Sequence, residues 1–105
     1  MAHTLKQGDI MYSSWGYNQT NITFYRVTRA TATTVKLERL RNKLVERMNV
    51  MDLVAPSNES NGDVGRRKVK RSVYDDEDYV EINSYKLAFP WDGRPKAKTG
   101  AGLGH

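Results

Sequence analysis

The residues best suited to bind another molecule are two aromatic rings and two amides close together near the N-terminus. They are Trp15, Tyr17, Gln19 and Asn21. Aromatic rings stack on bases and sugars while amides donate and accept hydrogen bonds, so this set suits contact with a base, a sugar or a peptide backbone. A structural role also fits. Trp15 and Tyr17 would then cover one end of a core, and Asn21 would cap a turn by bonding nearby backbone groups.

A second candidate site is a basic segment in the middle of the chain. It contains Arg66, Arg67, Lys68, Lys70 and Arg71. A further basic group between residues 26 and 47 includes Lys36, Arg39, Arg41 and Lys43. Such cations attract phosphates or an acidic protein. The acidic residues between positions 75 and 81 leave another interpretation open, in which the two segments pair across a hairpin and neutralise each other.

The residue types needed for catalysis or metal binding occur without a suitable arrangement. His3 and His105 lie near the chain ends, where no partner holds them in a fixed geometry. The acidic run 75–78 lacks the alternating spacing and central glycine of a calcium loop, which favours a solvated turn. Ser13 and Ser14 have no recognisable base. We therefore predict a protein that is not an enzyme, with no catalytic residue, no metal site and no cofactor.

The length of 105 residues predicts one domain with a modest core. The chain contains no cysteine, which fits a reducing compartment. The first residues lack the apolar run of a signal peptide, and no segment is long and apolar enough to cross a bilayer. We expect a cytoplasmic protein without a membrane partner, and its net charge of +5 is consistent with an anionic partner.

The aromatic turn is expected to connect two strands. Ile10 to Tyr12 alternates in polarity, and Phe24 to Thr28 is aromatic and β-branched. The next segment, 31–47, starts with alternating apolar and charged residues and predicts a long bent strand. From Leu37 onward the apolar residues also approach helical spacing, so a helix over 38–48 is the alternative.

The second half of the chain predicts short strands separated by turns. Residues 50–56 suggest an edge strand that Pro56 ends, followed by an exposed loop over 57–63. The strands expected after this loop are 66–73, 79–82 and 85–89. In the segment 91–95, Trp91 is expected to fold back onto the barrel, and residues 96–105 are expected to form a flexible tail.

Several motifs along the chain resemble a family of small proteins from bacteriophages, prophages and plasmids. They are Gly8-Asp9-Ile10, Ser14-Trp15-Gly16-Tyr17, Gln19-Thr20-Asn21, Phe24-Tyr25-x-Val27, Pro56, Arg66-Arg67-x-Val69 and Trp91-Asp92-Gly93-x-Pro95. The resemblance covers nearly the whole chain and implies a mobile-element origin in bacteria and an all-β fold, but no activity. Members of the family tend to have Asp where this chain has Asn18, so a carboxylate role there does not carry over.

These patterns together predict an all-β fold, with a minor helix only if 38–48 adopts one. We expect a small, strongly bent antiparallel barrel of the Src-homology-3 type, with five or six strands, formed by residues 1–95. Turns that contain Trp15 and Trp91 are expected to close one end. Closing the sheet is favourable because a short chain cannot otherwise protect its strand edges.

Three functions remain open at the level of sequence. We favour a non-enzymatic accessory protein of a mobile element that binds a host protein or nucleoprotein complex, in the manner of anti-CRISPR inhibitors. The alternative is direct nucleic-acid binding through the basic strand and the aromatic turn. A third possibility is a small-molecule or weak hydrolytic site at Trp15, Tyr17 and Asp92, which requires a pocket.

Overall fold

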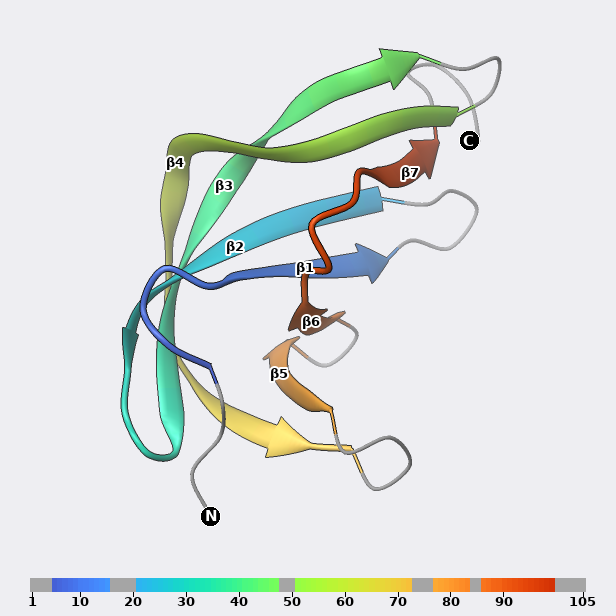
Figure 1. Cartoon of the computed structure of the whole chain (residues 1–105). Coiled ribbons are helices and arrows are strands. Elements are labelled where there is room, and N and C mark those ends of the chain that lie inside the picture. Colours follow the sequence, from blue (N-terminus) through green and yellow to red (C-terminus); the bar gives the residue numbers. More distant parts are fainter. Residues whose placement is uncertain (1–4, 16–20, 48–50, 73–76, 84–85, 100–105) are drawn as a thin grey trace.

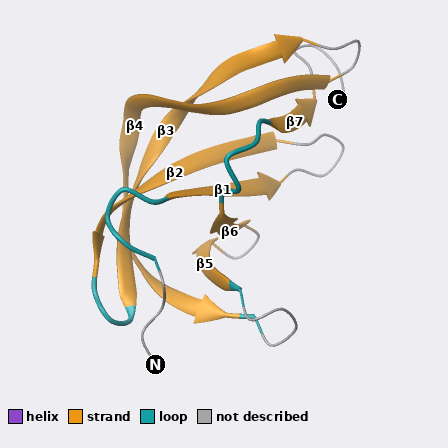
Figure 2. Ribbon diagram, viewed as in Figure 1, coloured by secondary structure: helices purple, strands orange, loops and turns teal. Residues whose placement is uncertain are grey.

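The computed structural model describes residues 5–15, 21–47, 51–72, 77–83 and 86–99, and all regular structure in these ranges is β (Figures 1 and 2). The strands are β1 (Ile10–Trp15), β2 (Asn21–Ala30), β3 (Thr34–Arg47), β4 (Met51–Arg71), β5 (Asp78–Asn83), β6 (Lys86–Pro90) and β7 (Lys96–Thr99). Neighbouring strands pair antiparallel throughout. The predicted all-β class is therefore confirmed. Residues 38–47 belong to β3, so the helix alternative is wrong over this range.

Six of the strands form a closed ring. Their order is β3-β2-β1-β6-β5-β4, and a further pairing between β3 and β4 closes the ring. β7 pairs with the first residues of β4, whereas β5 pairs with its last residues. This closed ring confirms the predicted small, bent antiparallel barrel. Closure is favourable because the backbone groups of the six strands find hydrogen-bond partners within the ring.

β4 is a single strand of 21 residues, and this corrects the predicted division into an edge strand, a loop over 57–63 and a second strand. Pro56 does not end the strand, since it lies opposite Asn42 of β3. The pairing shifts register repeatedly between Leu37 and Asn42, where β4 has more residues than β3. Gly62 and Gly65 there have φ angles of 110° and 94°. The turn-forming residues therefore bend a strand through bulges and do not interrupt it.

The central strands bury residues on both faces. On β2, Tyr25 and Val27 face the inner core, whereas Ile22 and Phe24 face a second cluster with Leu40. Alternate residues of a strand point to opposite faces, so a two-sided strand loses the usual polar alternation. Figure 1 shows the reason: β1 and β2 lie between the arm of β3, β4 and β7 above and β5 and β6 below.

The turn after β6 fixes Trp91 against the second cluster, as predicted. The Trp91 ring makes an edge contact with Phe24 at a centroid distance of 5.7 Å. Its Nε1 donates a hydrogen bond of 2.7 Å to the Arg94 carbonyl, and the Arg94 amide donates one of 3.0 Å to Asp92 Oδ1. The proposed partner lid lies at Trp15, whose side chain is outside the described residues.

The expected flexible tail begins with an ordered strand. Residues 96–99 form β7, which pairs with residues 51–54 of β4. The Lys96 ammonium also lies 4.4 Å from the centre of the Tyr12 ring. Residues 96–99 of the predicted tail are thus a strand in the structure, and the predicted domain boundary at residue 95 lies just before it. Residues 100–105 lie outside the described ranges.

Candidate functional site

Four cations gather on the outer face of three adjacent strands. They are Arg29 of β2, Lys36 of β3, and Arg66 and Lys68 of β4, and we call them the basic ladder. Lys36 lies opposite Arg29 on one side and opposite Arg66 on the other. Lys68 follows two residues after Arg66 and therefore shares its face. All four side chains are exposed.

The charges of the basic ladder are not neutralised within the described part of the chain. Ion pairs form at six other places in the described ranges, and none involves a ladder residue. Like charges directly opposite each other destabilise a sheet. The fold therefore retains an unfavourable arrangement that a bound anion would relieve.

A small pocket lies in the ladder. Its volume is about 60 Å³, and its lining consists of Arg29, Thr31, Thr34, Lys36 and Arg66. The two threonine hydroxyls hydrogen-bond to each other at 2.7 Å and hold the turn between β2 and β3. Guanidinium and ammonium groups around so small a space suit a single phosphate group, since arginine presents a planar fork of donors to oxyanions.

The predicted basic segment divides between two roles, because three of its five cations bond to groups of β5. Lys70 forms an ion pair of 2.7 Å with Glu81, and Arg71 forms one of 3.2 Å with Asp78. The hydrogen bond to Glu81 raises the pKa of Lys70. Arg67 points toward β5, where its Nε donates to the Ile82 carbonyl at 3.2 Å. Pairing with the acidic segment thus accounts for Lys70 and Arg71, and only Arg66 and Lys68 join the ladder.

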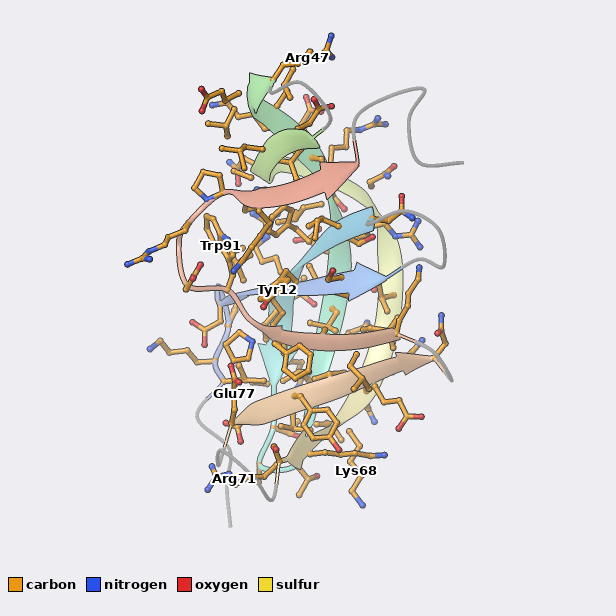
Figure 3. All side chains as sticks on the ribbon, turned by 90° about the vertical axis from the view of Figure 1, so that its right-hand side faces the viewer. Tyr12, Arg47, Lys68, Arg71, Glu77 and Trp91 are labelled. Atoms are coloured by element: carbon orange, nitrogen blue, oxygen red, sulfur yellow. The ribbon has the colours of Figure 1, made fainter. Side chains whose placement is uncertain are left out.

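The other basic residues singled out on β3 lie away from the ladder. Arg41 approaches Glu59 at 3.6 Å, and Lys43 is exposed farther along the strand. Arg39 lies near Lys86 of β6. The pKa of Lys86 is lowered by partial burial and, to a smaller extent, by the charge of Arg39. Figure 3 shows Arg47 at one end of the molecule and Lys68 at the other, so the cations do not form one continuous patch.

The predicted aromatic and amide site is described only at its edges. Asn21 starts β2 opposite Trp15 and is half-buried. The Trp15 side chain, Tyr17 and Gln19 lie outside the described residues, so their contact with a partner stays a prediction. Asp92, the acid of the third hypothesis, is exposed and accepts a backbone hydrogen bond from Arg94, which lowers its pKa. In this turn it acts as a structural cap.

A row of aromatic rings on the outer face was missed by the sequence reasoning. Tyr12 of β1 lies opposite Phe89 of β6, and the pairing of Val80 with Ala88 places Tyr79 of β5 beside Phe89. The ring centroids are 6.4 Å apart for Tyr12 and Phe89 and 6.1 Å apart for Phe89 and Tyr79. We call these three residues the aromatic row. The sequence shows only that each ring lies on the opposite face of its strand from a buried neighbour. It does not show that the three rings are adjacent, because that depends on the register between the strands.

No group of three or more His, Cys, Asp or Glu side chains in the described ranges is arranged to hold a metal ion. The same ranges contain no helix long and apolar enough to span a membrane.

Comparison of the chain with protein-family models, curated proteins and solved structures gave no match.

Proposed function

We propose that this protein is a non-enzymatic nucleic-acid-binding β-barrel that holds a phosphate backbone on the basic ladder. The observation that carries the proposal is the cross-strand arrangement of Arg29, Lys36 and Arg66, three exposed cations side by side. Phosphate contacts from Arg and Lys supply most of the affinity of sequence-independent binding. The ladder also extends along β4 to Lys68, so successive phosphates can contact successive cations.

The test measures how binding depends on salt. A fluorescent single-stranded 20-mer is titrated with the protein at several salt concentrations between 50 and 200 mM. If four ladder cations contact phosphates, the plot of log affinity against log salt has a slope of about −3. Replacing two of them in the variant Lys36→Ala/Arg66→Ala should reduce the magnitude of this slope by about 1.4.

A charge-matched control separates the ladder from net charge. The variant Lys43→Ala/Arg94→Ala removes the same two charges from exposed positions outside the ladder and should keep the original slope. An equal reduction of the slope in both double variants would show that the overall charge of the protein, and not the ladder, determines binding. Absence of binding by the unmodified protein at 50 mM salt would rule out the proposed function.

A second candidate is an accessory protein that docks on a host protein or nucleoprotein complex, such as a defence system, and the resemblance to mobile-element proteins motivates it. The observation that favours it is the exposure of two adjacent apolar side chains near the end of β3. Leu44 is 48% exposed and Val45 is 51% exposed. Exposed apolar residues with charged neighbours are suited to protein contact. Their position on the projecting arm places them away from the basic ladder.

This second candidate predicts a partner that survives nuclease treatment. Immobilised protein is incubated with a nuclease-treated bacterial lysate, and bound proteins are identified by mass spectrometry. Capture of a stoichiometric host protein, lost with Leu44→Ser/Val45→Ser and retained with Lys36→Ala/Arg66→Ala, supports it. Loss of all partners on nuclease treatment favours the nucleic-acid function.

A further inference from the structure

The inner face of the strands that carry the aromatic row is already filled by other residues. Met11, Val80 and Ala88 are the sequence neighbours of the three ring residues, and each has an exposure of 0% in the inner core. The rings therefore project from the opposite face. In an antiparallel sheet with one face on the core, the other face usually carries polar residues.

Packing within the protein accounts for one end of the row only. Tyr12 contacts the second cluster, and Lys96 lies 4.4 Å above its ring. Phe89 and Tyr79 belong to neither core cluster among the described residues, and both are half-buried, so part of each remains accessible. Leu87, two residues before Phe89 on the same face, is 41% exposed. The apolar surface thus continues beyond what the second cluster covers.

Positive charge begins where the row ends. Tyr79 lies opposite Lys70 of β4, and Lys68 and Arg66 follow on the same outer face at two-residue intervals. Lys70 is held by Glu81, whereas Lys68 and Arg66 belong to the basic ladder. An occupant that meets both surfaces needs flat apolar groups joined to a string of anions, which is the chemistry of a nucleic-acid strand with unpaired bases.

We propose, on the basis of the nucleic-acid-binding function above, that the aromatic row stacks unpaired bases and that the preferred ligand is single-stranded. The rings are 6.4 and 6.1 Å apart, wider than the spacing of about 3.4 Å between stacked bases in a strand of a duplex. Bases that stack on neighbouring rings are therefore separated from one another. A duplex keeps its bases stacked inside and presents only its phosphates to the ladder.

The test compares three labelled probes of equal length and charge per strand. They are a single-stranded thymidine 20-mer, the same strand in a duplex, and an abasic deoxyribose-phosphate strand. We expect the single strand to bind at least 10-fold more tightly than the abasic strand. The variant Tyr79→Leu/Phe89→Leu keeps apolar volume but removes the rings, and it should lose at least 10-fold in affinity for the single strand. Its affinity for the abasic strand should be unchanged.

Control variants keep the result interpretable. Tyr79→Phe retains the ring and should bind normally, and Asn61→Ala, at an exposed position of β4 outside the row and the ladder, should have no effect. If the double variant does not fold by circular dichroism, Tyr79→Leu alone, at the end of the row next to β4, should show about half of the loss on a logarithmic scale.

The possible failures are distinguishable. Equal affinity for the thymidine and abasic strands, or equal or tighter binding of the duplex, overturns base stacking and leaves phosphate binding intact. Binding of none of the three probes overturns the proposed function itself. Capture of a protein partner that is lost with Tyr79→Leu, without any nucleic-acid binding, assigns the row to a protein interface and also overturns the proposal.

Discussion

The basic residues of this protein differ in what lies opposite them. Arg26 faces Glu38 across the β2–β3 pair, with Nε 2.6 Å from Oε2, and Lys70, opposite Tyr79, forms an ion pair with Glu81 two residues along β5. Lys36, in contrast, has Arg29 and Arg66 as its two cross-strand neighbours. Position in the sheet, and not residue type, therefore decides which cations form ion pairs within the described ranges and which do not.

The pair of Arg26 and Glu38 predicts a measurable loss of stability in acid. The hydrogen bond from Arg26, with a smaller contribution from Ser60, lowers the pKa of Glu38 from its ordinary value. A lowered pKa in the folded state means that the stabilisation is complete above the unfolded pKa and is lost as the pH falls through the folded pKa. Urea unfolding between pH 3 and 7 should show that Glu38→Gln removes on the order of 1 kcal/mol at pH 7.

The same measurement contains its own control. The effect of Glu38→Gln should shrink as the pH is lowered and the native carboxyl becomes protonated. Glu46→Gln, at an exposed position of β3, should leave the curve unchanged. A constant loss at every pH would show that packing of the side chain, and not its charge, stabilises the barrel.

The repulsion within the basic ladder predicts a stabilising substitution. Lys36→Gln removes the central charge, so at low salt the melting temperature should rise by about 2–4 °C. The gain should disappear in 1 M salt, where the screening length falls to about 3 Å. Lys43→Gln, elsewhere on β3, serves as the control. An unchanged melting temperature would mean that the ladder charges are too far apart to repel one another.

Among the elements, the strands β1, β2, β3, β5 and β6 follow from local pattern, because each has alternating or β-branched residues between turn signals. The segment 57–63 was wrongly predicted as a loop, because Ser, Asn and Gly are common in loops and tolerate many backbone angles. Residue type does not show whether a partner strand lies alongside the segment. β3 does continue, to Arg47, and it supplies the hydrogen bonds that keep β4 a strand through its bend.

The bulged part of β4 predicts a backbone effect at glycine. Gly65 has a φ of 94°, and the nearest atom to an added Cβ would be the mobile Arg67 Nη1 at 3.6 Å. Gly65→Ala therefore has space but a strained backbone, and it should destabilise the protein by about 1–2 kcal/mol in urea unfolding. Asn61→Ala, in the same segment, should change stability by less than about 0.5 kcal/mol. An equal loss of stability in Gly65→Ala and Asn61→Ala would show that the backbone angle at Gly65 is not the source of the strain.

At the scale of the whole molecule, the sequence predicted the class of fold and only part of the site. Composition was enough to single out Arg66 and Lys68. That Arg29 and Lys36 lie beside them follows only from the register of three strands. That register depends on bulges, and a bulge shifts which face a residue occupies. The aromatic row was missed because it depends on the register of β1, β6 and β5, which local sequence pattern does not give.

The strand β7 stabilises the barrel through its pairing with β4. β7 pairs with residues 51–54 and places Lys96 on the Tyr12 ring, so a chain that stops at Pro95 loses these hydrogen bonds and the cation–π contact. Net values of about 0.5–1.5 kcal/mol per hydrogen bond and about 0.5–1 kcal/mol for the cation–π contact predict a drop in melting temperature of at least 5 °C. A chain that stops at Thr99 keeps all described pairs and is the matched control. If both truncated chains melt together, residues 1–95 form the complete folding unit, and β7 lies on the barrel without stabilising it.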